Sequence, residues 1–141
     1  MFGEAIFCSN DPKSPVTVTS VSNSTVTYLS YNKIMGLCSH VCTFHTKLIS
    51  NLVRVIANKN LFLNFKIELL SARSIREKLN IYFSKQIELK KSTKFEIPFS
   101  RAELANFLNV NRSALSRELS IMQREGIIKF NKNKFEVEHY F

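Results

Sequence analysis

The chain contains 141 residues with a mass of 16.3 kDa, which corresponds to one ordinary domain or two very small ones and excludes a large enzyme. Hydrophobic residues make up 45% of the sequence and charged residues 22%, so the chain is expected to bury a core. Lys and Arg number 20 against 11 Asp and Glu, and the net charge of +9 favours a polyanionic partner, nucleic acid before an anionic membrane.

The whole positive excess lies in residues 41–141, because residues 1–40 carry two basic and two acidic side chains. The first residues lack a signal peptide, and no run approaches the roughly 18 apolar residues of a membrane span. Three cysteines, an odd number, fit a reducing compartment better than a disulfide scaffold. We therefore expect a soluble cytoplasmic protein with no membrane partner.

Two short strands are predicted near the start of the chain. Pro15–Thr19 and Ser24–Leu29 alternate apolar with polar residues, and turn-forming residues at Ser9–Pro12 and Ser22–Ser24 flank them. Because an isolated hairpin is only marginally stable in water, these strands are expected to need further strands or a partner.

From about Phe44 the period of the apolar residues changes to that of a helix, which is predicted over residues 45–70. Steps of four and three, the spacing of a coiled-coil seam, connect Ile49, Val53, Ile56, Asn60, Leu63, Ile67 and Leu70. The one polar residue of this seam, Asn60, favours a single register and a two-stranded state. We expect the helix to pair with a second copy; the alternative is that it packs only within its own chain.

A shorter amphipathic helix is predicted next, capped by Ser71 and ending at about Gln86. A basic connection over residues 90–94 leads to a predicted strand at Phe95–Ile97, and Pro98 delays the following helix.

Two further helices have clear boundary signals. Ser100 and Glu103 form a capping box, with Phe99 and Leu104 placed as a hydrophobic staple, so a helix is predicted over Arg101–Leu108. Asn109 tolerates the left-handed conformation needed in the turn, and Asn111 can cap the next helix. That helix is predicted from Arg112 to about Glu125, ends at Gly126 and buries Leu115, Leu119 and Met122.

Two helices joined by a three-residue turn indicate a helix-turn-helix, whose second helix enters the DNA major groove. Arg112, Ser113, Ser116 and Arg117 lie in the first two turns of that helix. A hairpin with a basic tip, Asn131–Lys134, follows as a wing, and its Lys132 and Lys134 suit phosphates. The alternatives are a plain helical hairpin with solvated arginines and tip lysines that serve only solubility. Neighbouring charges such as Glu77 with Lys78 and Arg117 with Glu118 are interpreted as solvated faces.

A small group of sulfur and imidazole side chains is the only candidate metal site in the sequence. On a helix Cys38, Cys42 and His45 would share a face and could hold zinc, iron or haem, with Cys8 as a distant fourth ligand. The favoured alternative is that the cysteines are small buried residues and the histidine is exposed, so no metal is expected.

The sequence resembles the Crp/Fnr transcription regulators over nearly its whole length. The most specific stretches are Arg76–Leu79, Phe99–Ala105, Asn111–Leu119 and Arg124–Ile128. The resemblance implies an α+β fold with a partial β-roll sensor remnant of the cyclic-nucleotide-binding type over residues 1–44. A dimerisation helix over 45–70 and a winged helix-turn-helix over 71–141 would follow.

The resemblance also implies roles for single residues. Arg112 and Arg117 take positions that contact bases or line the groove, with Ser113 and Ser116 between them, and Ser100 with Arg101 would hold backbone phosphates. Many members carry Glu where this chain has Ser113, so their known operators are not assumed here. The candidate DNA-binding residues are Ser100, Arg101, Asn111, Arg112, Ser113, Ser116, Arg117, Lys132 and Lys134.

The resemblance places Met1 well inside the family's sensor, so a shortened sensor is expected. Gly3 and Glu4 match a Gly-Glu pair that binds the effector in members using cyclic nucleotides. Ser14–Pro15 stands where those members have Arg-Ser, and Lys13 lacks the planar fork that holds phosphate. Ordinary cyclic-nucleotide binding is therefore not expected; no cofactor is predicted, and the effector is left open.

The sequence contains no Gly-rich phosphate loop and no hydrolase or metalloprotease motif, so an enzyme is not expected. The predicted function is a homodimeric, sequence-specific regulator that binds double-stranded DNA at an inverted repeat, with RNA polymerase as a further candidate partner. The alternatives are a sensor-deficient interaction protein that heterodimerises with a full-length regulator, and a truncated fragment.

Overall fold

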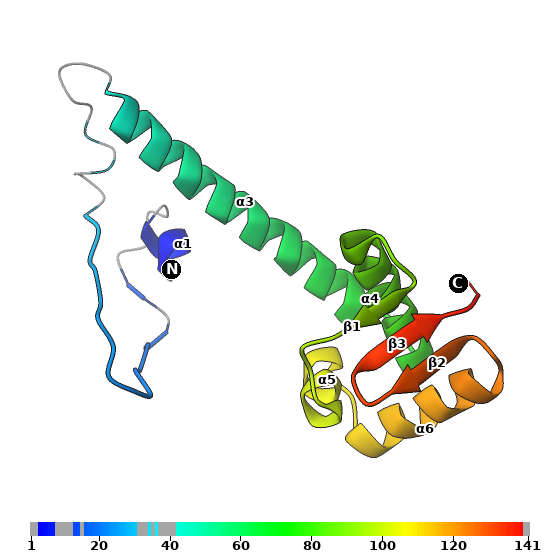
Figure 1. The fold of residues 1–141 in the computed structure, drawn as a ribbon. Coiled ribbons are helices and arrows are strands. Elements are labelled where there is room, and N and C mark those ends of the chain that lie inside the picture. The colour runs from blue at the N-terminus through cyan, green and yellow to red at the C-terminus, as the bar shows by residue number, and fades with distance from the viewer. Residues whose placement is uncertain are drawn as a thin grey trace. The chain divides into compact units, whose positions relative to one another are not determined.

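The computed structural model describes residues 3–7, 13–14, 16–30, 34, 36 and 42–139. The chain divides into two compact units, residues 1–62 and 63–141. Helices dominate the described residues, and one antiparallel sheet accompanies them (Figure 1). The α+β class expected from the sequence is therefore confirmed.

The first unit contains a short helix, α1 (Glu4–Phe7), and an irregular segment over residues 16–30. The strands expected around this segment are absent, because residues 16–30 form no ladder and all their side chains are exposed. Two short strands bury too little surface to hold each other in water, and the described residues of this unit supply no third strand. Pro15 and the turn at Ser9–Pro12 lie outside the described residues, and the partial β-roll is not confirmed.

Helix α3 (Thr43–Ser71) confirms the long helix expected over residues 45–70. Its 29 residues extend over about 44 Å at about 1.5 Å per residue. Leu69 is fully buried, whereas Val53, Leu63 and Ile67 of the predicted seam are exposed by 59%, 58% and 63%. A single chain therefore leaves much of this apolar stripe open to solvent.

Helix α4 (Ile75–Lys90) begins after Ser74, not after Ser71 as the sequence analysis expected. The Ser74 hydroxyl accepts the backbone N–H of Glu77 at 3.1 Å, and the Glu77 carboxylate accepts that of Ser74 at 3.4 Å. Ser71 has no carboxylate three positions later with which to form such a reciprocal box, and it is the last residue of α3. The helix also runs past Gln86 to Lys90.

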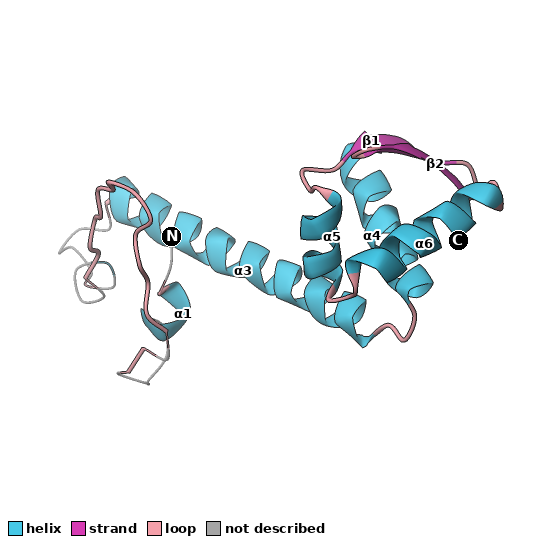
Figure 2. Ribbon diagram, turned by 90° about the horizontal axis from the view of Figure 1, so that it is seen from below, coloured by secondary structure: helices cyan, strands magenta, loops and turns pink. Residues whose placement is uncertain are grey.

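The second unit contains an antiparallel sheet in the order β1-β3-β2. Its strands are β1 (Lys94–Glu96), β2 (Ile128–Asn131) and β3 (Lys134–Val137). Phe135 on the central strand stands opposite Phe95 of β1 and Phe130 of β2. Helices α4, α5 (Arg101–Leu108) and α6 (Arg112–Arg124) lie on one side of this sheet (Figure 2).

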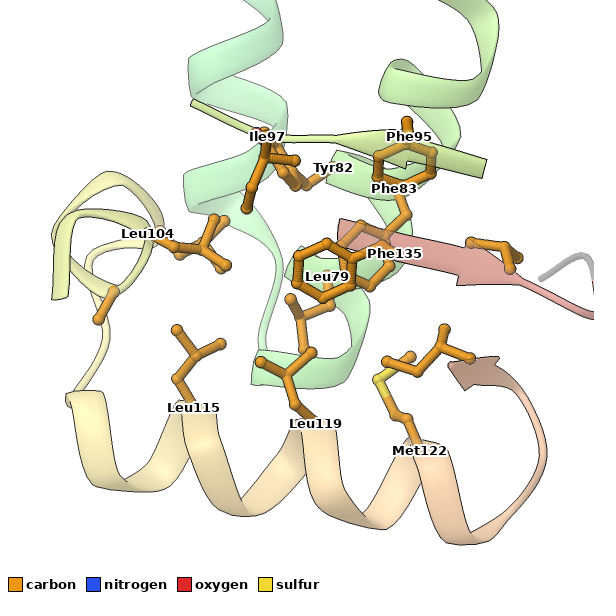
Figure 3. Packing of buried hydrophobic residues seen from close by; sticks show 14 of the residues in the cluster. Leu79, Tyr82, Phe83, Phe95, Ile97, Leu104, Leu115, Leu119, Met122 and Phe135 are labelled. Atoms are coloured by element: carbon orange, nitrogen blue, oxygen red, sulfur yellow. The ribbon is translucent and has the colours of Figure 1, made fainter. Parts of the chain in front are cut away.

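One hydrophobic core joins these helices to the sheet. Leu115, Leu119 and Met122 of α6 point toward Leu79 of α4 and Phe135 of β3 (Figure 3). Burial of such side chains is the main favourable contribution to folding, at roughly 25 cal/mol per Å² of apolar surface. The core therefore determines where the exposed side of α6 lies.

Candidate DNA-binding site

Helix α5 starts at the capping box that the sequence predicts. The Ser100 hydroxyl accepts the backbone N–H of Glu103 at 3.3 Å, and the Glu103 carboxylate accepts that of Ser100 at 2.7 Å. The bond from the Ser100 N–H lowers the pKa of the Glu103 carboxyl, because it favours the charged form. This reciprocal pair satisfies two N–H groups that the first turn of α5 cannot pair itself.

A three-residue turn joins α5 to α6. Asn109 has a left-handed backbone with φ of 52°, a conformation that Asn adopts more readily than most residues. The N–H of Val110 donates to the carbonyl of Ala105 at 3.0 Å, and Val110 packs against the core. Asn111 caps α6, since its Oδ1 accepts the N–H of Ser113 at 2.8 Å and that of the next residue at 3.3 Å. The predicted turn and cap are confirmed.

Helix α6 has a buried side and an exposed side. Leu115, Leu119 and Met122 are fully buried and fix the helix against the core. Side chains three or four residues apart are neighbours on the surface of a helix. The four predicted groove residues lie together in the first two turns of α6: Arg112, Ser113, Ser116 and Arg117. Ser116 is half-buried, and the other three are exposed.

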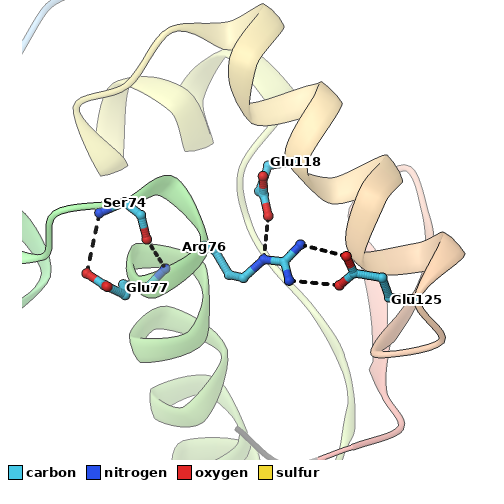
Figure 4. A network of polar contacts seen from close by, with 5 residues as sticks. All are labelled: Ser74, Arg76, Glu77, Glu118 and Glu125. Atoms are coloured by element: carbon cyan, nitrogen blue, oxygen red, sulfur yellow. Dashed lines mark hydrogen bonds and ion pairs between the residues drawn. The ribbon is translucent and has the colours of Figure 1, made fainter.

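Arg76, in the first turn of α4, connects α4 to α6 (Figure 4). Its Nε donates to Glu118 Oε1 at 2.6 Å, and its Nη1 and Nη2 donate to the two carboxylate oxygens of Glu125 at 2.8 and 3.1 Å. These bonds raise the pKa of Arg76, the bond to Glu125 most strongly. One planar guanidinium thus serves two carboxylates on α6 and its C-cap, which a lysine ammonium would do less well.

No sequence pattern predicts this ion-pair network, and the expectation that Glu118 lies on a solvated face is wrong, because its side chain is only 21% exposed and bonds Arg76. Arg76 lies 42 positions from Glu118 and 49 from Glu125, so no local spacing signals the contact. Glu77 is exposed, as expected of a solvated face, and its carboxylate in addition belongs to the capping box of α4, which was not predicted. The Ser74–Glu77 spacing was the signal that could have shown this.

Two lysines donate to the C-terminal end of α5. Lys66 Nζ on α3 donates to the Phe107 carbonyl at 2.5 Å and lies 3.8 Å from the centroid of the Phe107 ring. Lys78 Nζ on α4 donates to the Leu108 carbonyl at 3.2 Å. The last carbonyls of a helix lack partners within it, and its negative end attracts cations. Burial, and then the charge of Lys78, lowers the pKa of Lys66.

The hairpin of β2 and β3 follows α6, which ends where Gly126 takes a positive φ of 73°. Lys132 and Lys134 at its tip are exposed, which fits both the predicted phosphate contacts and the alternative that they serve only solubility. Arg101 is half-buried, and its Nη2 donates to the Lys132 carbonyl at 3.1 Å. Ser100, Arg101 and Lys132 line one groove between the start of α5 and the hairpin.

The candidate metal ligands are only partly described. Cys38 lies outside the described residues, as does Cys8. Cys42 Sγ lies 3.2 Å from His45 Nδ1 and accepts the backbone N–H of His45 at 3.4 Å. In the described part of the chain no three His, Cys, Asp or Glu side chains gather as metal ligands would.

The candidate effector residues lie at the start of α1. Gly3 has a positive φ of 81°, and the Glu4 carboxylate pairs with Lys59 Nζ on α3 at 2.5 Å. The hydrogen bond from Lys59 lowers the pKa of Glu4. The other oxygen of this carboxylate, Oε2, is buried without a hydrogen-bond partner among the described residues. One Glu4 oxygen is thus already engaged within the chain.

The helix pair, its three-residue turn and the exposed basic side of α6 define a helix-turn-helix domain of the DNA-binding class. Residues 70–139, roughly half of the chain, match the family model of the Crp-like helix-turn-helix domain. This match supports a Crp/Fnr family regulator with a C-terminal helix-turn-helix, and the domain indicates a DNA-binding transcription regulator.

No curated protein matches the chain. Within the described ranges, none of the helices combines the length and the apolar character that a membrane span requires.

Proposed function

We propose that the protein is a homodimeric regulator that recognises an inverted repeat in double-stranded DNA through α6. The observation that carries the proposal is the division of α6 into a fully buried apolar side and a side that exposes Arg112, Ser113 and Arg117. A helix fixed in this way presents its first two turns as a rigid unit, which base-specific contacts in the major groove require.

The exposed residues divide into two kinds of contact. Arg112 and Arg117 can each donate two hydrogen bonds to one guanine, whereas Ser113 and Ser116 can pair with several bases. Ser100, Lys132 and Lys134 are proposed for the phosphates, and Asn111, whose Oδ1 caps α6, retains its amide nitrogen as a donor. The sequence preference would then depend on α6, and the salt dependence largely on the groove and the hairpin.

The dimer is proposed to form along the exposed stripe of α3. Burying apolar side chains stabilises association by roughly 25 cal/mol per Å², and Val53, Leu63 and Ile67 offer such surface. Two copies related by a twofold axis would present two α6 helices to successive major grooves about 34 Å apart. The proposed interface also includes Ile49, Ile56, Asn60 and Leu70.

The DNA-binding part is tested by selecting duplexes from a random pool with the purified chain at rising salt. We expect an enriched inverted repeat. Arg117→Ala should lose its preference at one base position, at a cost of about 1–3 kcal/mol, whereas Lys132→Ala should weaken binding to all duplexes alike. Salt-labile binding without an enriched sequence would contradict base recognition by α6 and favour a fragment or a partner-dependent subunit.

The dimer is tested by measuring the mass in solution of two matched variants of α3. Leu63→Lys places a charge in the proposed seam, whereas Leu61→Lys places the same charge on another exposed leucine, which lies outside it. We expect the first variant to be monomeric and the second to remain dimeric. A monomeric parent chain, or equal effects of both changes, would contradict this interface and leave the heterodimer as the better model.

A further inference from the structure

The guanidinium of Arg101 is already engaged by the hairpin. Its Nη2 donates to the Lys132 carbonyl at 3.1 Å, and its Cζ lies 5.0 Å from the ring centroid of Phe130 and 5.6 Å from that of Phe135. The two rings stack on each other with centroids 5.8 Å apart and an interplanar angle of 27°. Arg101, the first residue of α5, therefore packs against both strands of the hairpin.

This environment differs from that of a phosphate-binding arginine open to solvent. Arg101 is half-buried, and burial lowers its pKa from the usual range. A charge that has lost part of its hydration is stabilised by nearby aromatic rings and by a carbonyl that accepts its hydrogen bond. Lysine has neither the planar group for the rings nor the fixed direction of the N–H donor.

Arg101 bonds a turn of the hairpin whose backbone conformation is energetically unfavourable on its own. Lys132 has a φ of 54°, in the left-handed region that residues other than glycine rarely adopt. On the other side of the turn, the Asn133 amide nitrogen donates to Glu96 Oε1 at 2.8 Å and to the Ile97 carbonyl at 3.2 Å. The turn is thus tied to β1 through Asn133 and to α5 through Arg101.

Lys132 itself has an exposed side chain and lines the same groove as Ser100 and Arg101. Lys90 and Lys132 are exposed cations of this groove, whereas Arg101 is half-buried and donates to the backbone carbonyl of Lys132.

We propose that Arg101 is a positioning residue, which holds the tip of the β2–β3 hairpin against α5 so that Lys132 meets the DNA backbone. This role replaces the direct phosphate contact expected for Arg101, and it rests on the proposed DNA-binding function.

The test is a double-mutant cycle on binding to a random-sequence duplex of about 30 base pairs, measured over a range of salt concentrations. Lys132→Ala should weaken binding roughly five- to tenfold at 0.1 M salt and reduce the slope of log K against log salt by about 0.9. Arg101→Ala should do the same, and the double variant should lose no more than either single one. Arg101→Lys, which keeps the charge, should behave like Arg101→Ala. Lys129→Ala, which removes a cation of β2 that pairs with Glu138, is the matched control for charge.

Hydrogen exchange of the free protein provides a measurement that does not depend on DNA. In Arg101→Ala the amides of residues 131–134 should exchange at least tenfold faster, while those of α6 should be unchanged. Unchanged exchange at the hairpin would overturn the proposal, because the turn would then not need Arg101.

The binding outcomes separate the two proposals. Additive losses, a slope reduced by about 1.8 in the double variant, or recovery in Arg101→Lys would identify Arg101 as a direct phosphate contact and overturn the positioning role. A parent chain that binds no duplex would overturn the proposed function and, with it, this role.

Discussion

Removing Arg76 should weaken the attachment of α6 to α4 by an amount that the structure allows to be worked out. The side chains of Arg76 and Glu125 are 37% and 43% exposed, so solvent screens their pair and limits it to about 0.5 kcal/mol. Glu118 is 21% exposed, and its hydrogen bond to the guanidinium is expected to contribute about 1 kcal/mol. Arg76→Ala should therefore lower the free energy of unfolding by about 1.5 kcal/mol.

The assay is urea unfolding of the full chain followed by circular dichroism, at fixed protein concentration because association shifts apparent stability. Arg73→Ala is the matched control, since among the described residues its side chain forms no ion pair. Arg76→Lys should recover less than half of the loss, because an ammonium cannot bond both carboxylates in one plane. The reasoning would be refuted if Glu118→Gln cost as much in the Arg76→Ala background as in the parent chain.

Three other changes test the core, the cap and the capping box. Leu119→Ala should lower the free energy of unfolding by about 3–4 kcal/mol in urea, since the side chain is fully buried; a loss below about 1 kcal/mol would contradict the core assignment. Asn111→Ala should cost about 1 kcal/mol in the same assay and Asn111→Asp much less, because only the second keeps an oxygen for the first turn of α6. The pKa of Glu103 is lower in the folded chain than its usual 4.5, so its carboxylate stabilises the fold above that pH and the contribution is lost as pH falls through the folded-state pKa. Unfolding measured as a function of pH should therefore show the parent losing stability on acidification relative to Glu103→Gln; parallel curves would rule this out.

The features of the site that the sequence predicts correctly are local ones. Ser100 with Glu103, Asn109 and Asn111 each act on backbone groups within three or four positions, so residue type and spacing suffice to identify them. The apolar period of Leu115, Leu119 and Met122 likewise determines which side of α6 is buried.

The features that the sequence does not predict depend on distant partners. Arg76, Lys66 and Lys78 meet groups 30 to 49 positions away, and nothing in their neighbourhood distinguishes them from solvated charges. The prediction of strands near the start of the chain was wrong for a related reason. An alternation of apolar and polar residues describes the two faces of a strand, but it does not supply a neighbouring strand to pair with. Arg101 shows both cases, because its position at the start of α5 was predictable and its contact with the hairpin was not.

The lysine contacts at the end of α5 set a limit on how the DNA-binding part can be isolated. A fragment that starts at Ser74 would keep the capping box of α4 and Lys78, but it would lack Lys66 and Leu69. The Phe107 carbonyl would then lose its donor, and the core would lose a fully buried leucine. The last two turns of α3 therefore have two roles. They belong to the helix that is proposed to join two copies, and they also complete the core of the domain that is proposed to contact DNA.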